Sequence, residues 1–453
     1  MEMKLRSKQP KLENGSRIAV IGGGPGGSYF TYFLLNMASM MGLDILVDVY
    51  EPKDFSKVGP GGCNHCGGIV SESLVQILAT EGINLPTDVV QRGIGSYVMH
   101  MDIGEVQIQT PLEEMRIAAI HRGGGPKGAV DTKWKSFDNF LQELTIEKGA
   151  TIIHDRVTEV GFHEGRPLLK TRSGSPKTYD LLVVAAGVNT VLNKLFKDVD
   201  LAYQPPRITR TVIREYKLGA ETIEEYLGNA MHVFLLDIPR LEFAAIIPKG
   251  DYVTVCMLGQ DIDKELFETF MEAPAVIECL PPELRLDQYA CQCLPVMNVG
   301  GATQPYGDRV VFIGDCGVTR LYKDGIGGAY RTAKAAAATA IFHGIAAEDF
   351  EKYYWPACRR LNFDNAVGRV IFEVTSLIQQ HRFARQAVLR MTIDEQNKAG
   401  KNRRMSMILW DMFTGSASYR DIFLRTIHPA YFLKLGWYVL VSLLAFNKSE
   451  TAR

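Results

Sequence analysis

The sequence predicts an α/β fold, in which a parallel sheet is joined to an inserted antiparallel sheet and a helical C-terminal region. Three observations predict this arrangement. Two short apolar runs near the N-terminus flank a segment with helical periodicity, which is typical of a βαβ unit. Segments rich in β-branched residues follow between residues 151 and 295. Helical patterns then dominate residues 346–453.

Composition limits the possible functions. The chain has 453 residues, of which 46% are hydrophobic, so it can bury a large core and form two or three structural units. Its formal net charge of −1 argues against a nucleic-acid partner. The polar N-terminal residues lack the apolar run of a signal peptide, so we expect a cytoplasmic protein. Composition leaves the oligomeric state open.

The first predicted element is a strand over Arg17–Ile21, which runs into the glycine cluster Gly22–Gly27. A helix is predicted from Gly27 to about Met41, and a second strand over Ile45–Glu51. A buried strand, a glycine-rich turn and a helix in this order predict a Rossmann-like dinucleotide-binding unit.

The glycine cluster fits the pattern G-x-G-x-x-G. Gly22 permits a tight turn, Gly24 lets the backbone approach a pyrophosphate, and Gly27 lets the helix pack closely on the strand. The helix N-terminus presents N–H groups to the phosphates. Glu51, at the end of the second strand, is placed to accept hydrogen bonds from a ribose diol, and it would repel a 2′-phosphate.

The middle of the chain is rich in strand candidates. Three segments from Thr151 onward (151–162, 168–173 and 179–187) are separated by turn residues, as in an antiparallel meander. Four more candidates lie between about residues 200 and 295, and they read as a separate sheet suited to covering a ligand; they are residues 208–216, 231–237, 241–248 and 252–259.

A second site signal lies near residue 315. An apolar strand, Val310–Gly314, ends at Asp315, and the glycine turn Gly325–Gly328 then precedes a helix predicted over Tyr330–Phe342. An acidic group at this place can hold the ribityl chain of a flavin, and the helix N-terminus can stabilise negative charge on the reduced ring. The two turns together therefore predict FAD as the cofactor.

These elements predict a discontinuous domain organisation. The FAD-binding domain is expected to comprise residues 17–90, 120–195 and 300–345. The substrate-binding sheet is expected to comprise residues 91–119 and 200–298, and the helical C-terminal region residues 346–453.

Several motifs resemble those of the geranylgeranyl reductase family, within the hydroxylase-like FAD superfamily. The resemblance covers roughly residues 17–345 and is weaker toward the C-terminus. It rests on IGGGPGGS, VYEP, CGGIVSESL, HRGGGP with SFDNFL, DRVTEV, LLVVAAG, AAIIPKGDYVTV and FIGDCGVTRLYKDGIGGAYRTAKAAA. The glycine motifs are shared by the whole superfamily, whereas CGG before a helix and IIPKGD before a strand point to the reductases.

The resemblance implies a set of FAD contacts, which are Gly26, Glu51, Cys66, Gly67, Arg122, Val157 (by its backbone to the adenine), Asp315, Gly327 and Gly328. Three departures concern the substrate rather than the flavin. The link after Arg122 is longer than in the family, Tyr322–Lys323 replaces a proline-containing stretch, and residues 241–248 lack a tryptophan.

The eight cysteines predict reduced, mostly buried thiols rather than a disulfide framework. Cys63 and Cys66 have C-x-x-C spacing, and with Cys291 and Cys293 they could supply four thiolates to zinc or to an iron–sulfur cluster. The second spacing is unusual for either metal, so no metal site is expected. Cys66 matches the family cysteine beside the flavin; a buried thiol and a redox pair with Cys63 are the alternatives.

Three further residues are candidates for a role near the flavin. Lys323 precedes the second glycine turn, where it could neutralise reduced flavin or bind an anionic substrate; the alternative is a solvated loop lysine. His65 and His121 are weaker candidates for proton donors.

The C-terminal segment Ala430–Phe446 is apolar, interrupted by Lys434 and Ser442, and carries Tyr431, Trp437 and Tyr438. It is too interrupted for a spanning helix. It could lie in a membrane interface at the inner face of the membrane, or form a buried helix or a dimer contact.

The resemblance implies reduction of C=C bonds in a polyprenyl or similarly apolar lipid substrate, with hydride supplied by reduced FAD. Only one dinucleotide fingerprint is present, so NAD(P)H or a ferredoxin-like protein is expected as a transient electron donor. An aromatic-hydroxylase-type monooxygenase is an alternative, as is a non-catalytic flavin-binding partner in lipid synthesis. A flavin halogenase is disfavoured, because the aromatic-rich motif of those enzymes is not found.

Overall fold

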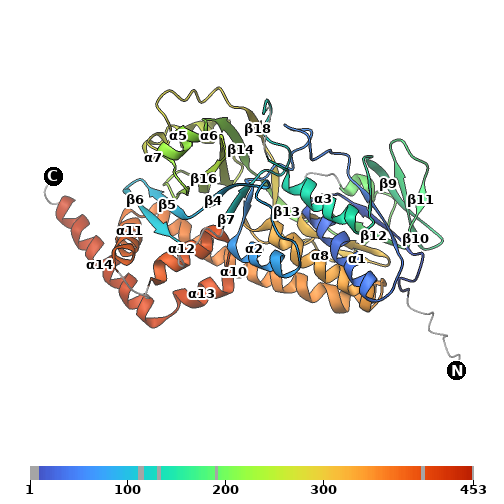
Figure 1. The fold of residues 1–453 in the computed structure, drawn as a ribbon. Helices are drawn as coiled ribbons and strands as arrows, with labels where there is room; N and C mark the ends of the chain where they lie inside the picture. The colour runs from blue at the N-terminus through green and yellow to red at the C-terminus, as the bar shows by residue number, and fades with distance from the viewer. Residues whose placement is uncertain (1–9, 111–116, 130–133, 189–191, 399–402, 451–453) are drawn as a thin grey trace.

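The computed structural model describes residues 10–110, 117–129, 134–188, 192–398 and 403–450. It confirms the predicted fold class, because a parallel sheet, a separate and mostly antiparallel sheet and a series of C-terminal helices are all present (Figure 1).

The parallel sheet has six strands and is centred on the N-terminal strand. In spatial order they are β20 (Tyr306–Gly307), β21 (Val310–Phe312), β12 (Leu181–Val184), β1 (Arg17–Ile21), β2 (Leu46–Tyr50) and β8 (Thr151–Ile153). All neighbours are parallel except β20 and β21. The carboxyl ends of β1, β2 and β21 therefore lie at one edge of the sheet, where ligands bind in open α/β sheets.

Alternation along β1 divides its side chains between two covered faces. Ile18 and Val20 pack under the helices α1 (Pro25–Met40), α3 (Phe137–Glu147) and α8 (Gly325–Phe342). Ala19 and Ile21 pack on the other face, where the small antiparallel sheet of β9 (Val157–His163), β10 (Arg166–Thr171) and β11 (Lys177–Thr178) contributes apolar residues. Burial of both faces accounts for the nearly continuous apolar sequence of this strand.

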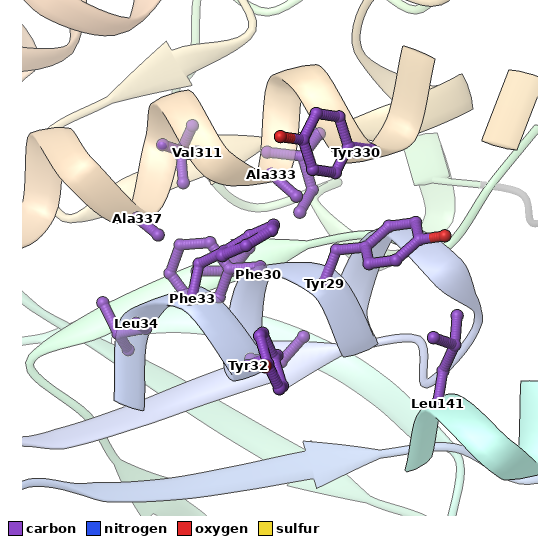
Figure 2. Packing of buried hydrophobic residues seen from close by; sticks show 14 of the residues in the cluster. Tyr29, Phe30, Tyr32, Phe33, Leu34, Leu141, Val311, Tyr330, Ala333 and Ala337 are labelled. Atoms are coloured by element: carbon purple, nitrogen blue, oxygen red, sulfur yellow. The ribbon is translucent and has the colours of Figure 1, made fainter. Parts of the chain in front are cut away.

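Helices α1 and α8 pack directly on one another, although they lie far apart in the sequence (Figure 2). Aromatic residues of α1 meet small residues and one tyrosine of α8. The ring of Tyr330 lies 5.5 Å from that of Phe33 and 5.9 Å from that of Tyr29. Ala333 and Ala337 of α8 are fully buried in the same cluster, as the alanine-rich sequence predicts.

The expected meander over residues 151–187 is only partly correct. Residues 157–178 do form the antiparallel sheet β9–β10–β11. The first and last segments instead supply β8 and β12 to the parallel sheet, with β12 directly beside β1. The sequence LLVV of β12 is buried at every position, which is typical of a central parallel strand and not of a meander edge.

The second large sheet has seven strands drawn from two separate stretches of the chain. In spatial order they are β18 (Cys291–Cys293), β14 (Val212–Lys217), β17 (Tyr252–Gly259), β16 (Leu241–Lys249), β15 (Ala230–Phe234), β5 (Ser96–Met101) and β6 (Gly104–Gln109). Strands β15 and β5 are parallel and the others antiparallel. Two smaller sheets connect it to the rest, namely β13 (Arg207–Arg210) with β19 (Val296–Gly300), and β3 (Ile69–Val70), β7 (Ile117–Ile120) and β4 (Val90–Ile94).

The seven-stranded sheet has two buried faces, which we call the inner and the capped face. The inner face includes Met99, Ala245 and Ile247 and packs against the C-terminal helices. The capped face includes Phe234 and Ile246 and packs under α5 (Ala220–Tyr226), α6 (Lys264–Met271) and α7 (Pro274–Ile277).

Residues from 346 onward are mostly helical, as predicted. The long helices are α10 (Trp355–Gln380), α11 (Arg382–Asn397), α12 (Arg404–Thr414), α13 (Tyr419–Thr426) and α14 (Pro429–Glu450). Figure 1 shows α14 at one end of the molecule and β9–β11 at the other. Within the described part of the chain, no single helix is long and apolar enough to cross a membrane. Helix α13 and residues Pro429–Leu444 of α14 reach that length and apolarity only when they are taken together, and they are bent by 69° relative to one another.

Candidate functional site

The turn between β1 and α1 has the geometry that its glycines require. Gly22 has φ +102°, and an added Cβ would lie 2.4 Å from the carbonyl oxygen of Ala185. At Gly27 a Cβ would lie 1.9 Å from the carbonyl oxygen of Gly22. At Gly26 the first contact would be at 3.6 Å, so no neighbour in the chain demands glycine there. Contact with a cofactor is the remaining reason for Gly26 and stays a prediction.

Helix α1 is preceded at its N-cap position by Gly24, which supplies no side-chain cap. The guanidinium of Arg122 lies close by, since an added Cβ on Gly24 would be 3.9 Å from its Nη2. Asp138, in the first turn of α3, accepts hydrogen bonds from Arg122 Nη2 and from Asn64 Nδ2, each at 2.9 Å, and Arg122 Nε also contacts it. Burial disfavours the charge on Arg122, but Asp138 outweighs this effect and the pKa of Arg122 is raised. A guanidinium fixed by its ion pair with Asp138 therefore lies at a helix N-terminus, a place where anions bind.

Glu51 follows β2 and is buried against the same turn. Its Oε2 accepts a hydrogen bond from the N–H of Gly23, and its Oε1 accepts one from the N–H of Lys53, both at 2.9 Å. Burial raises the pKa of Glu51, while the two hydrogen bonds oppose that shift. Each carboxylate oxygen can accept a further hydrogen bond, which suits a ribose diol. Val157 lies in the buried cluster that includes Tyr50, the residue before Glu51.

The second glycine turn meets the first one in space. Asp315 follows β21, and burial raises the pKa of Asp315 while the charge of Arg122 lowers it. Gly325 is adjacent, because an added Cβ would lie 3.7 Å from Oδ1 of Asp315. Two residues from opposite ends of the sequence, Arg122 and Asp315, thus act on each other electrostatically. The predicted split of the flavin site between the two chain ends is compatible with this arrangement.

The N-terminus of α8 carries a carboxylate of its own. Asp324 caps the helix from a left-handed conformation, φ 52°, and its Oδ1 accepts a hydrogen bond from the N–H of Gly327 at 3.1 Å. Arg320 and Arg331 pair with Asp324 at 3.2 and 3.0 Å. Gly328 packs tightly against this loop, since an added Cβ would lie 2.5 Å from Thr319 Oγ1. Arg320 also lies 3.8 Å from Asp364, so the charges of the two arginines and the two aspartates balance at this turn.

Lys323 is half-buried, which excludes the solvated-loop interpretation. Its Nζ lies 5.0 Å from the ring centre of Phe243, 5.3 Å from that of Phe413 and 5.9 Å from that of Phe372. We call these three rings the phenylalanine cage. Burial lowers the pKa of Lys323 well below its usual value, and Arg320 lowers it further. The cage joins the inner face of the sheet, the C-terminal helices and the loop before α8.

The loop carrying Cys66 lies against the inner face. The Cys66 thiol contacts the Arg122 guanidinium, and an added Cβ on Gly67 would lie 3.7 Å from Cys256 Sγ. Burial raises the pKa of Cys293 to about 12, and the neighbouring thiols Cys63, Cys291 and Cys66 add to the shift. The two cysteine pairs are therefore gathered in one region, as free thiols. No three of these thiols lie close enough together to hold a metal among the residues described.

A buried ion pair that the sequence does not reveal lies on the inner face. Lys249 is fully buried, and its Nζ is 3.7 Å from Glu215 Oε1. Thr254 Oγ1 donates a hydrogen bond to the same carboxylate at 2.8 Å. Burial raises the pKa of Glu215, and the charge of Lys249 lowers it. The motif IIPKGD contains Lys249, but only the register of β14, β17 and β16 brings Glu215 and Thr254 to it.

The two histidine candidates lie near this region. Burial lowers the pKa of His121 well below its usual value, and Lys249 lowers it further. Burial also lowers the pKa of His65, with Lys53 and Arg122 adding to the effect. Both imidazoles are therefore neutral near pH 7, which weakens the hypothesis that either donates a proton as imidazolium. Asn64 and Asp138 are site residues that the sequence did not single out.

Comparisons with known proteins define the fold. No protein-family model and no curated protein matches the chain. Among solved structures, a flavoprotein/dehydrogenase from Cytophaga hutchinsonii is similar with a TM-score of 0.61 and 13% identity, over 95% of this chain and 100% of that one. The halogenase PltM has a TM-score of 0.59 and 13% identity, over 97% and 93% of the two chains. The p-nitrophenol 4-monooxygenase PnpA from Pseudomonas putida DLL-E4 has a TM-score of 0.56 and 14% identity, over 90% and 100%.

These likenesses extend over nearly the whole chain, so the fold is that of FAD-binding flavoproteins. At this level of identity they establish the fold and not the reaction. The finer expectation of a geranylgeranyl reductase is a proposal, because the neighbours named above are a dehydrogenase, a halogenase and a monooxygenase.

Proposed function

We propose that this protein is an FAD-dependent oxidoreductase that reduces carbon–carbon double bonds of an apolar, isoprenoid-like substrate. Lys323 in its phenylalanine cage is the observation that carries the proposal. A single ammonium group beside the second glycine turn, otherwise surrounded by aromatic carbon, suits a reaction that needs one proton next to an apolar molecule.

The residues present fit FAD. Glycine at position 24 keeps the start of α1 free of a side chain beside Asn64 and Arg122, which suits the close backbone approach of a pyrophosphate. Glu51 is held at the turn with capacity for a ribose, and Asp315, which lies within the electrostatic influence of Arg122, would be the acceptor for the ribityl chain of a flavin. When bound and reduced, FAD supplies the hydride.

The residues of this chain supply the rest of the proposed reaction. Alkene reduction adds a hydride to one carbon and a proton to the other, and Lys323 Nζ holds that proton. The lowered pKa of Lys323 makes its ammonium group a stronger acid than an exposed lysine. The phenylalanine cage excludes water and gives apolar contacts to the substrate. Cys66 contacts Arg122, the guanidinium that lies beside the start of α1 where the pyrophosphate would bind.

The test is anaerobic turnover of reduced protein with a polyprenyl alcohol, followed by mass spectrometry of the product. Wild-type protein should add a pair of hydrogens per double bond. Lys323→Met should lower turnover by about 10²–10⁴-fold, the usual contribution of a positioned acid, with unchanged flavin content. Lys323→Arg keeps the charge but cannot release a proton near neutral pH, so it should be equally slow.

The pH profile gives a separate check. An ammonium donor acts below its pKa, so wild-type turnover should fall as the pH rises through the lowered pKa of Lys323, well before the usual range of a lysine. Lys323→Met should lose that limb of the profile. Equal turnover of wild type and Lys323→Met would remove Lys323 from the chemistry. Absence of any alkene reduction by the flavin-loaded wild type would overturn the proposed reaction.

A flavin monooxygenase is the second candidate, because the fold is similar to that of p-nitrophenol 4-monooxygenase. Rapid oxygen consumption coupled to hydroxylation of a substrate would favour it over a reductase. Halogenases share the fold too, but the sequence lacks the aromatic-rich motif of those enzymes.

The proposal includes an external electron donor, NAD(P)H or a ferredoxin-like protein, since one dinucleotide fingerprint is present in the sequence. A non-catalytic flavin-binding role predicts a different result. Bound FAD would then remain oxidised with every physiological donor and would give no turnover after chemical reduction.

A further inference from the structure

A group of metal-ligating side chains lies on the capped face of the seven-stranded sheet. His100, His232 and Cys279 are all buried, and one ligand atom of each lies within 4.8 Å of the other two. His100 Nε2 is 2.9 Å from His232 Nδ1. Cys279 Sγ is 3.5 Å from the first nitrogen and 3.4 Å from the second. The residues described for the flavin site belong to other parts of the fold.

The fold brings the three residues together from distant positions. Parallel pairing of β5 with β15 places His100 opposite Phe234, two residues from His232, so both imidazoles project from the same face. The two rings stack with centroids 5.0 Å apart. Cys279 follows α7, which covers that face, and its thiol also donates to the carbonyl oxygen of Ala275 at 3.2 Å.

The remaining ring nitrogens have acceptor partners. His100 Nδ1 lies 2.9 Å from Glu105 Oε2, and His232 Nε2 lies 3.3 Å from the carbonyl oxygen of Leu227. Carboxylates and carbonyls only accept hydrogen bonds, so each of these nitrogens carries the proton of a neutral imidazole. The inward nitrogens are then both lone-pair donors facing one another. The cysteine has one hydrogen to share among two nitrogens and a carbonyl, whereas a cation bound by the thiolate would satisfy both nitrogens at once.

The geometry matches zinc. Tetrahedral zinc with Zn–N near 2.0–2.1 Å and Zn–S near 2.3 Å places two nitrogens about 3.4 Å apart, and nitrogen and sulfur about 3.5 Å apart. The two nitrogen–sulfur distances, 3.5 and 3.4 Å, already agree. The nitrogen–nitrogen distance of 2.9 Å requires the rings to separate by about 0.5 Å. Carboxylate and carbonyl partners behind ligating histidines are the usual outer contacts of zinc sites.

A cavity of about 410 Å³ reaches the group from outside. His100 lines it, and so do four carboxylates, those of Asp102, Glu105, Asp237 and Glu278. Arg385 pairs with Asp102 at 2.7 Å and with Asp237 at 3.3 Å, so the excess negative charge belongs to Glu105 and Glu278. This acidic cavity favours entry of a cation and leaves room for a water molecule as the fourth ligand.

We propose that His100, His232 and Cys279 bind a Zn²⁺ ion that clamps the sheet to its helical cap. Two imidazoles and a thiolate select zinc over magnesium or calcium, which prefer oxygen ligands. The ion would tie the hydrogen-bonded strands β5 and β15 to the segment after α7, which otherwise packs on the sheet through apolar contacts. The capped face is the opposite one from the phenylalanine cage, so the ion would lie apart from the proposed alkene reduction.

The first test measures metal in the purified full-length protein. We expect about one zinc per chain, removal by a strong chelator, and a rise in melting temperature when zinc alone is returned. Cys279→Ser should lose the zinc, whereas Cys358→Ser, another buried cysteine, should retain it. Zinc retained at full occupancy in Cys279→Ser, or no zinc and no thermal shift in wild type, would overturn the proposal.

Cobalt separates loss of the site from loss of folding. The cobalt-loaded wild type should show a thiolate-to-cobalt charge-transfer band. Cys279→His should still bind cobalt but lack that band, because the ligand is kept and the thiolate is removed. Glu105→Gln should keep the band and weaken metal affinity by about 10–100-fold, as expected for an outer partner. A charge-transfer band that survives in Cys279→His would place the metal on other cysteines and refute the assignment.

Discussion

At the scale of single residues, Glu51 is the clearest test of how this chain holds FAD. Glu51→Gln keeps the shape of the side chain and the acceptor for the N–H of Gly23 but removes the charge. A hydrogen bond to a charged group is stronger than a neutral one by about 1–1.5 kcal/mol. We therefore expect about tenfold weaker FAD binding, measured by titration of the flavin-free protein.

Glu147 provides the matched control, since it is an exposed glutamate on α3. Glu147→Gln should bind FAD like the wild type. An unchanged dissociation constant in Glu51→Gln would show that this carboxylate does not reach the ribose.

Cys66 and Cys63 differ in their surroundings. Cys66 contacts the Arg122 guanidinium, whereas burial raises the pKa of the Cys63 thiol. If Cys66 helps to position groups beside the flavin, Cys66→Ala should lower turnover by roughly 10–100-fold and leave flavin content unchanged. Cys63→Ala should have a small effect. Severe and equal losses would indicate a redox pair, and mild, equal losses would indicate two buried thiols; steady-state kinetics with flavin absorbance distinguishes these outcomes.

Residue-scale prediction from the sequence worked where the signal is local. One βαβ unit contains Gly22 and Gly27, which lie where β1 turns into α1, and Glu51, which follows β2. Their relative positions therefore follow from their spacing along the sequence. Asp138 and Glu215 could not be found in that way. Their positions depend on contacts between elements distant in sequence, such as the pairing of Arg122 with Asp138 and the register of β14 with β17.

At the scale of elements, the packing of α1 on β1 depends on Gly27. Gly27→Ala would place Cβ 1.9 Å from a backbone carbonyl oxygen, so the helix must move away from the strand. We expect the free energy of unfolding to fall by about 2–4 kcal/mol, as overpacking of a rigid site does. Chemical denaturation of the flavin-free protein measures this loss.

Gly26 is the companion position in the same helix turn. Gly26→Ala meets its first neighbour at an ordinary contact distance of 3.6 Å, so stability without flavin should hold or rise slightly. FAD affinity should fall instead, because the added methyl group would occupy the predicted approach of the cofactor. Similar losses of stability in both variants would contradict this separation of roles.

The sequence predicted the type of most elements but not every partner. The apolar run of β12 was recognisable as a strand. Its place beside β1 was not, because the strands that precede it in the sequence, β9–β11, form a separate sheet and β12 returns to the parallel one. Helix α8 begins at Gly325, five residues before the alanine-rich segment that marked it, because Asp324 caps it through an unusual left-handed conformation. Glycine has a low helix propensity, so the glycines in the first turn of α8 do not indicate a helix when the sequence is read alone.

At the scale of the whole molecule, α14 presents two different sides. Lys434 pairs with Glu395 at 2.9 Å and Tyr438 donates to Asp394 at 2.6 Å, which fixes one side on α11. The other side exposes apolar residues, with Leu433 77% and Trp437 65% accessible. An exposed apolar side of this kind suits a peripheral contact with lipid, which we propose as the route of an apolar substrate.

Liposome co-sedimentation tests this contact. A few hundred Å² of apolar surface entering lipid contributes several kcal/mol at about 25 cal/mol per Å², enough for reversible binding. The full chain should sediment with vesicles, and a Leu433→Ser/Trp437→Ser double variant should not. The double variant should keep its FAD and its melting temperature, because both residues are exposed. If wild type stays in the supernatant, the exposed side serves another purpose.

The division of the parallel sheet between the two ends of the chain sets the timing of maturation. Strand β1 and helix α1 leave the ribosome first, but β21, Asp315 and α8 follow only after the whole seven-stranded sheet has been synthesised. A nascent chain that ends before Gly325 lacks one wall of the proposed flavin site and the alanine surface on which the aromatic residues of α1 pack. The second wall of the proposed site therefore forms only after Gly325 has been synthesised, and the apolar side of α1 stays uncovered by α8 until then.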